Sequence, residues 1–317
     1  MRIVFLGTPD FAVASLRALV EAKKNVVGVI TAPDRPAGRG HKLRPSAVKE
    51  YAQSVGLPLL QPTNLKDPEF QQALKDWQAD LQIVVAFRML PESVWNMPAM
   101  GTFNLHASLL PQYRGAAPIN RAVMNGESES GVTTFLLQHA IDTGNILFRE
   151  KENISPDDTA GDLHDRLMDL GASLVVKTVD ALENGKVTPR HQDEFQSEGE
   201  VLREAPKLFK EDCQIDWNRS AQDIHNHIRG LAPFPGAFTR VKVGDTEKQL
   251  KVYSSIFEAQ DDDTSIDLPQ QLSEKDRLGV RLSGGILWLT QIQLEGKKRM
   301  PVADLLRGLN DQPELLF

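Results

Sequence analysis

The chain contains almost no cysteine. Cys213 is the single cysteine among 317 residues, so the sequence allows neither an intramolecular disulfide nor a cysteine-rich zinc cluster. No stretch reaches the roughly 18 consecutive apolar residues that a membrane-spanning helix requires, and the apolar run in residues 1–7 is too short for a signal peptide. These absences predict a cytoplasmic protein in a reducing compartment.

An excess of positive charge is also lacking. The formal net charge is -7, which argues against a protein that coats nucleic acid by bulk charge and leaves only a local basic contact open. The turn Gly7-Thr8-Pro9 lacks the Gly-x-Gly-x-x-Gly fingerprint, because Pro9 stands where the second glycine belongs. A dinucleotide site is therefore not expected there. With 41% hydrophobic and 25% charged residues, the composition is that of a globular protein.

The first half of the chain alternates short apolar runs with helical patterns. This alternation is typical of βαβ units, so it predicts an α/β domain with a doubly wound, mostly parallel sheet. The expected strands are residues 3–6, 26–30, 81–86, 102–106 and 132–137. The expected helices are residues 12–20, capped by Asp10, and residues 46–55 and 159–183.

Periodicity is lost between residues 189 and 206, which predicts a linker. Beyond it, a helix at 221–229 precedes four β-like runs, two pairs of which are separated by the turns Gly244-Asp245 and Gly284-Gly285. A small β-barrel with a terminal helix is the expected closure. We therefore predict three parts, at residues 1–189, 190–206 and 207–317.

One strand carries two polar side chains on one face. Side chains alternate along a strand, so Asn104 and His106 point one way and Phe103 and Leu105 the other. The strand is predicted to end at the carboxyl edge of a parallel sheet, where α/β proteins bind ligands. If the turn that carries Asp142 folds beside it, a carboxylate favours the charged imidazole, which can donate to a developing oxyanion.

Two further segments offer basic side chains. Phe87 and Arg88 end a buried strand, and Arg88 is either solvated or in contact with a ligand. Residues 34–45 hold four Lys/Arg against one Asp and are rich in Gly and Pro. They form either a solvated loop or a basic arm for phosphates.

The other histidines lack the spacing of metal ligands, so no metal site is expected. They are His139, His164, His191, His225 and His227. The acidic run 261–263 is interpreted as a solvated loop tip.

At this point the sequence resembles the 10-formyltetrahydrofolate-dependent formyltransferases, through the segments 104–111, 113–119 and 142–144. Residues 7–11, 33–40, 215–217 and 233–236 resemble the members that act on charged initiator tRNA. The resemblance implies a Rossmann-like catalytic domain followed by an OB-like barrel. In the segment 86–91 this chain is one residue shorter than the commoner family pattern and lacks its glycine, which changes the wall of the pterin pocket.

The resemblance also implies roles for particular residues. Asn104, His106 and Asp142 are catalytic, and 10-formyltetrahydrofolate is the co-substrate. The folate site is lined by Ser108, Leu109, Leu110 and Pro111, together with Phe87 and Arg88. The acceptor arm of initiator methionyl-tRNA meets Arg35, Arg39 and Lys42. The protein is expected to act as a monomer.

Two alternatives remain open from the sequence. A formyltransferase that acts on a nucleotide sugar or another small amine needs no basic arm. A non-catalytic RNA-binding protein with this fold is expected to lack at least one of Asn104, His106 and Asp142, and all three are present.

Overall fold

A computed structural model describes residues 1–37, 42–260, 268–309 and 311–317. Residues cluster by contact into two units, each built from more than one stretch of the chain. Unit 1 comprises 1–115, 129–153 and 164–204, and unit 2 comprises 116–128, 154–163 and 205–317. The linear division of the chain at residues 189 and 207 stays a prediction.

The elements of the first half are as follows. They are β1 (Ile3–Gly7), α1 (Asp10–Glu21), β2 (Val26–Ile30), β3 (Arg35–Ala37), β4 (Lys42–Arg44), α2 (Ala47–Ser54), β5 (Leu59–Leu60), α3 (Pro68–Asp76), β6 (Leu81–Val85), α4 (Glu92–Trp95), β7 (Thr102–His106), β8 (Arg114–Gly115), α5 (Pro118–Met124), β9 (Glu129–Leu136) and β10 (Ile146–Asn153).

The second half begins with the long helix α6. Its elements are α6 (Ala160–Glu183), the 3₁₀ helix η1 (Gln192–Phe195), β11 (Glu204–Ala205), the 3₁₀ helix η2 (Glu211–Cys213), α7 (Ala221–Leu231), β12 (Ala237–Val243), β13 (Thr246–Ala259), β14 (Gln270–Ser273), β15 (Leu278–Leu282), β16 (Gly285–Leu294), β17 (Met300–Pro301), α8 (Val302–Arg307) and β18 (Glu314–Leu316).

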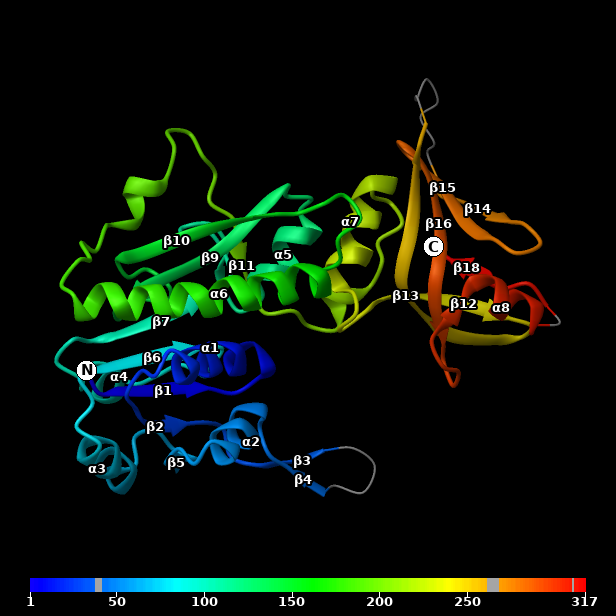
Figure 1. The fold of residues 1–317 in the computed structure, drawn as a ribbon. Helices are drawn as coiled ribbons and strands as arrows, with labels where there is room; N and C mark the ends of the chain where they lie inside the picture. The colour runs from blue at the N-terminus through cyan, green and yellow to red at the C-terminus, as the bar shows by residue number, and fades with distance from the viewer. Residues whose placement is uncertain (38–41, 261–267, 310) are drawn as a thin grey trace. The chain divides into compact units, whose positions relative to one another are not determined.

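Unit 1 is built on a seven-stranded sheet with the order β10-β9-β7-β6-β1-β2-β5 (Figure 1). The strands from β5 to β7 in this order are parallel, β9 is antiparallel to β7, and β10 is antiparallel to β9. On one face, α6 packs closely on β7, since a Cβ on Gly171 would fall 2.7 Å from the Leu105 side chain. On the other face, Phe70 of α3 and Val94 of α4 join an apolar cluster with the sheet. The predicted doubly wound, mostly parallel sheet is confirmed.

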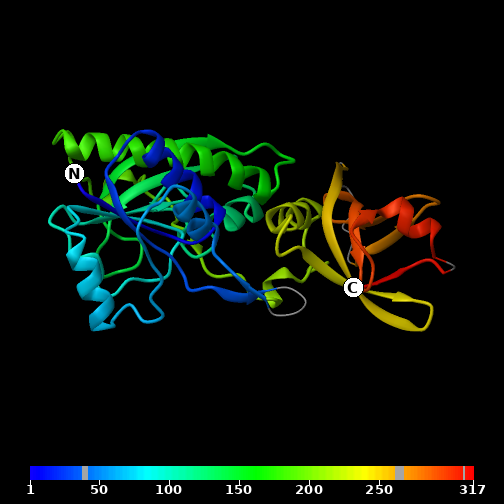
Figure 2. The ribbon, with the colours of Figure 1, turned by 60° about the horizontal axis from the view of Figure 1, so that its bottom comes forward.

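Three local features differ from the sequence expectations. Asp10 is the first residue of α1 and not its cap, because the extended Pro9 precedes the helix and no side chain caps it. Residues 146–153 form the edge strand β10, whose charged residues hide the apolar pattern. The arms of the basic segment pair as a two-stranded ribbon, β3 with β4, which projects from unit 1 (Figure 2).

Unit 2 contains an antiparallel sheet with the order β14-β15-β16-β13-β12-β18, and β17 pairs with β16. The two predicted turns join β12 to β13 and β15 to β16 as hairpins. Helix α5 belongs to this unit: Asn120 donates to the Gly230 carbonyl of α7 over 2.8 Å, and a Cβ on Gly230 would collide with Met124. The predicted OB-like, barrel-like sheet is confirmed.

Candidate active site

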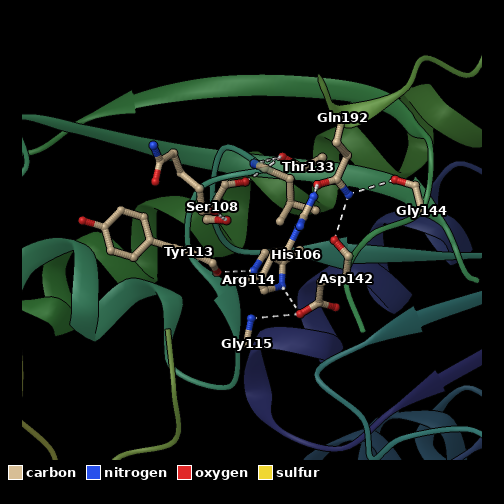
Figure 3. Close-up of polar contacts among 11 residues, drawn as sticks. His106, Ser108, Tyr113, Arg114, Gly115, Thr133, Asp142, Gly144 and Gln192 are labelled. Carbon is tan, nitrogen blue, oxygen red and sulfur yellow. Dashed lines mark hydrogen bonds and ion pairs between the residues drawn. The ribbon is translucent and has the colours of Figure 1, made fainter. Parts of the chain in front are cut away.

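His106 lies at the carboxyl end of β7, where the parallel part of the sheet meets the antiparallel strand β9. The side chain is buried, with 7% exposed. Its Nε2 lies 2.8 Å from the Tyr113 carbonyl oxygen (Figure 3). Because a carbonyl can only accept, this bond places the proton on Nε2. Nδ1 is the nitrogen that faces Asp142, 3.9 Å from its Oδ2.

Asp142 comes from the loop between β9 and β10. Its Oδ2 accepts a hydrogen bond from the Gly115 N–H over 3.0 Å, so backbone and imidazole both face the same carboxylate oxygen (Figure 3). The predicted pair of His106 and Asp142 is therefore brought together. The distance between Nδ1 and Oδ2 exceeds that of a direct hydrogen bond, so the two groups face each other as an ion-pair contact.

The backbone around this pair is strained. Asp142 has a φ of +53°, Tyr113 of +60° and Ala86, at the end of β6, of +46°. Residues other than glycine rarely adopt this left-handed region, and such strain gathers at functional sites. Two of the three residues belong to this site: Asp142 carries the carboxylate, and the Tyr113 carbonyl bonds to the imidazole.

Asn104 shares the face of β7 on which His106 lies. Its backbone is paired with Val84 of β6 and Phe135 of β9. Its Oδ1 is buried and has no hydrogen-bond partner among the residues described. An unpaired buried amide oxygen is costly, so this atom is available to accept a hydrogen bond from a ligand.

The segment from Ser108 to Pro111 is buried and bonded to its surroundings. Thr133 of β9 connects it twice: its hydroxyl donates to the Ser108 carbonyl over 2.6 Å and accepts from the Leu110 N–H over 3.2 Å. Leu110 packs in an apolar cluster with Phe135 and Ile146. The expected folate-lining segment is thus rigidly held next to His106.

Phe87 and Arg88 follow β6. Phe87 packs against the apolar cluster on the α3 and α4 face. The guanidinium of Arg88 donates to the carbonyls of Pro62 and Thr63. Burial, and then the charge of Arg35, lower the pKa of Arg88. Arg88 therefore anchors a neighbouring segment and lies within the electrostatic reach of the basic ribbon.

The basic ribbon, residues 35–37 and 42–44, is anchored at its base. Asp34 accepts hydrogen bonds from Lys49 over 2.7 Å and from Gln61 over 2.8 Å. The bond from Lys49 and that from Gln61 lower the pKa of Asp34. Arg35 is exposed on β3, while Arg39 and the acidic run 261–263 lie outside the described residues. The backbone of Lys42 pairs with Ala37.

Sequence reasoning missed Gln192 and Thr133, and it missed the bond of Arg114 to Gln192. Thr133 was within an expected strand, but nothing in the sequence marks the direction of that strand. Gln192 fell within the predicted linker, and its contacts are 48 and 50 residues away. No local pattern could have found it.

The described ranges contain no cluster of three or more His, Cys, Asp or Glu suited to a metal ion. Among those same residues, no helix is long and apolar enough to cross a membrane.

The fold and the site define a class of group-transfer enzyme, and comparison with known proteins identifies it. The family model described as "Formyl transferase" matches residues 1–179, and "Formyl transferase, C-terminal domain" matches residues 207–310. The chain belongs to the formyl transferase family.

Relatives within the family are similar over nearly the whole length. The methionyl-tRNA formyltransferase of Bacteroides thetaiotaomicron is 53% identical over 97% of this chain and 95% of its own. That of Flavobacterium johnsoniae is 48% identical over 99% and 98%. In fold, the chain is similar to an N-formyltransferase from Helicobacter canadensis, with a TM-score of 0.66, 20% identity and coverage of 92% and 99%.

Proposed function

We propose that this chain transfers a formyl group from 10-formyltetrahydrofolate to the amino group of methionine on initiator methionyl-tRNA, for translation initiation. The observation that carries the proposal is the pair of His106 and Asp142 at the end of β7, in a chain about half identical to methionyl-tRNA formyltransferases over their full length. Family membership makes the chain a one-carbon transferase that uses 10-formyltetrahydrofolate.

The proposed chemistry is acyl transfer without a covalent enzyme intermediate. The methionine amine attacks the formyl carbon, which forms a new N–C bond and a tetrahedral intermediate with a negatively charged oxygen. The bond from carbon to N10 of the folate then breaks, and the proton lost by the amine goes to N10. The protein must therefore stabilise one oxyanion and move one proton.

Asn104, His106 and Asp142 have the chemistry that these two tasks need. The Asn104 amide and the His106 imidazole share a strand face, from which both can donate to the oxyanion. The unpaired Oδ1 of Asn104 supports a further contact, because the attacking amine is a donor that would satisfy it. Nδ1 of His106 is the nitrogen left for proton movement, since Nε2 is bonded to Tyr113. Asp142 holds the imidazole in its donating form.

The folate is proposed to lie along the segment from Ser108 to Pro111, with Phe87 and Arg88 beyond it. Support comes from the two bonds of Thr133, which fix this segment before the ligand arrives. Since Arg88 already donates to two carbonyls, its contribution to the folate site is through the shape of the wall.

The tRNA contact is proposed for Arg35 and Lys42 of the basic ribbon, for Arg39, which lies outside the described residues, and for unit 2. Arg35 is exposed, and Asp34 fixes the base of the ribbon from which it extends. Phosphate contacts position a nucleic acid, and arginine suits them. A cytoplasmic location is proposed from the single cysteine, and a monomer is proposed because nothing in the sequence demands more than one copy.

The test is transfer of labelled formyl from 10-formyltetrahydrofolate to three acceptors. Charged initiator tRNA is expected to be labelled fastest, elongator methionyl-tRNA is the control for discrimination, and an amino sugar nucleotide represents the small-amine alternative. Labelling of the sugar nucleotide alone would establish that alternative. Labelling of none of the three would overturn the proposed function.

A further inference from the structure

The segment between the two family matches, residues 180–206, contains a short helix that packs into unit 1. Its anchor is a pair of backbone hydrogen bonds between Arg190 and Ile146, at 2.8 and 2.9 Å. Phe195, at the other end of η1, lies between the guanidinium groups of Arg149 and Arg190, 4.9 and 4.4 Å from its ring centroid. These contacts fix η1 beside the start of β10.

Gln192, the first residue of η1, reaches the loop that carries Asp142 (Figure 3). Its side chain is 1% exposed. Nε2 donates to the carbonyl oxygens of Asp142 and Gly144, at 2.8 and 2.9 Å. Oε1 accepts from Nε and Nη2 of Arg114, at 3.0 and 2.6 Å. A guanidinium only donates, so Arg114 fixes which end of the amide faces the loop.

On the Asp142 side the loop is also held by the Gly115 N–H, which donates to the carboxylate, and by the ring contact of His139 with Trp95. Residues 138–141 are exposed, and Asp142 adopts a left-handed conformation. Gly144 is the fixed point beyond it, because a Cβ there would collide with the Leu136 carbonyl oxygen. Gln192 bonds the loop on both sides of Thr143, so it fixes the backbone that directly follows the Cα bearing the carboxylate.

We propose that Gln192, oriented by Arg114, is a positioning residue for the transfer reaction: it holds the Asp142 loop so that the carboxylate faces Nδ1 of His106. The proposal rests on the proposed role of Asp142. It makes the segment between the two family matches part of the catalytic apparatus. The side chains proposed to contact the oxyanion, Asn104 and His106, lie on β7 and make no hydrogen bond to Gln192 among the contacts described, so the proposed effect of Gln192 passes through the Asp142 loop.

The first measurement compares Gln192→Met, which keeps the length of the side chain but removes all four hydrogen bonds, with the wild type. Loss of positioning is expected to lower kcat about 10- to 100-fold. The KM for 10-formyltetrahydrofolate is expected to change less than about 2-fold, because the folate-lining segment is bonded to Thr133 and not to η1. Arg114→Met is expected to lower kcat in the same way, through the freed amide.

The decisive measurement is a double-mutant cycle with Asp142→Asn. If Gln192 acts through Asp142, Gln192→Met lowers kcat no further once the carboxylate is gone. If Gln192 has a general structural role, the two losses multiply and the positioning proposal is overturned. A normal kcat for Asp142→Asn alone would instead refute the role of Asp142 in the proposed function.

Controls separate positioning from loss of fold. Gln271→Met also removes a glutamine with two backbone bonds, to Pro313 and Leu315 of unit 2, and is expected to leave kcat unchanged. If Gln192→Met does not fold, Gln192→Glu replaces it, since this variant keeps the acceptor for Arg114 and loses the two donors to the loop. A kcat within about 2-fold of the wild type in a folded Gln192→Glu would also overturn the proposal.

Discussion

Two histidines are buried to the same degree and have opposite surroundings. His106 in unit 1 is 7% exposed, and His227 in unit 2 is 6% exposed. His106 has the Tyr113 carbonyl on one nitrogen and the Asp142 carboxylate facing the other. Neither nitrogen of His227 has a hydrogen-bond partner of normal geometry among the residues described.

The difference shows that partners, and not burial, give a histidine its chemistry. Burial lowers the pKa of His227 to about 4, and Arg219 and Arg121 act in the same direction against Asp212 and the Cys213 backbone. His227 is therefore a neutral core residue at physiological pH. The imidazole of His106 has an acceptor for one proton and a carboxylate beside the other nitrogen, which is the arrangement that the proposed proton transfer requires.

Replacing each histidine tests this contrast most directly. His106→Ala is expected to lower kcat about 100- to 1,000-fold, because an oxyanion donor and a proton carrier are lost together. His227→Leu fills a similar volume without polar atoms and is expected to leave kcat unchanged. Steady-state formyl transfer to charged initiator tRNA measures both. A near-normal kcat for His106→Ala would remove the basis of the comparison.

The pH dependence of the free energy of unfolding tests the expectation for His227. The folded-state pKa of His227, about 4, lies below the unfolded value of about 6.5, so the unfolded chain binds the proton first as the pH falls. The contribution of His227 to the free energy of unfolding is fully present above about pH 6.5 and is lost progressively as the pH falls to about 4. Between pH 7 and pH 5 the loss from this residue is about 2 kcal/mol.

Denaturant unfolding of the wild type and of His227→Leu at the two pH values measures this loss. The wild type is expected to lose more stability than the variant, and the difference between them is the contribution of His227. An equal loss in both proteins would mean that His227 is already protonated, or partnered, in the folded state.

The sequence predicted those parts of the fold that depend on local patterns. The alternation in Thr102–His106 placed Asn104 and His106 on one face, and continuous apolar runs marked the parallel strands. The direction of β9 and the existence of β10 were not predictable in this way, because residues 149–152 are all charged and β10 is an edge strand. The direction of a strand in the sheet depends on its packing against strands that are distant in the sequence.

The site was predicted where chemistry and spacing coincide within a few residues. His106 was predicted as catalytic from its neighbours on β7, while no role was predicted for His227. Gln192 and Thr133 could not be predicted as site residues, because each acts on backbone groups that the fold alone brings near. A side chain that donates to a backbone carbonyl does not require a particular residue type as its partner, so the sequence shows no matching pair.

Replacing Thr133 in the wall of the proposed folate site tests, with a smaller expected effect, what hydrogen-bond partners contribute. Thr133→Val leaves the Ser108 carbonyl and the Leu110 N–H unpaired in a buried place, at a cost of about 1–3 kcal/mol. We expect the KM for 10-formyltetrahydrofolate to rise about 5- to 10-fold, with kcat much less affected. Thr134→Val is the matched control: Thr134 faces α6, and its partner Thr178 keeps a bond to Leu174. A similar rise of KM in both variants would contradict the assigned wall.

The smallest expected effect concerns Arg35, whose side chain is exposed and whose backbone is paired with that of Arg44 in the basic ribbon. Arg35→Ala is expected to raise the KM for charged tRNA a few-fold, because one phosphate contact carries little affinity at physiological salt. It is also expected to lessen the slope of log affinity against log salt by about 0.7–0.9, since one fewer counterion is released. Lys151→Ala, which removes an exposed cation paired with Glu129, is the control and should leave the slope unchanged. An identical slope for both variants would take the ribbon out of the tRNA contact and leave unit 2 to supply it.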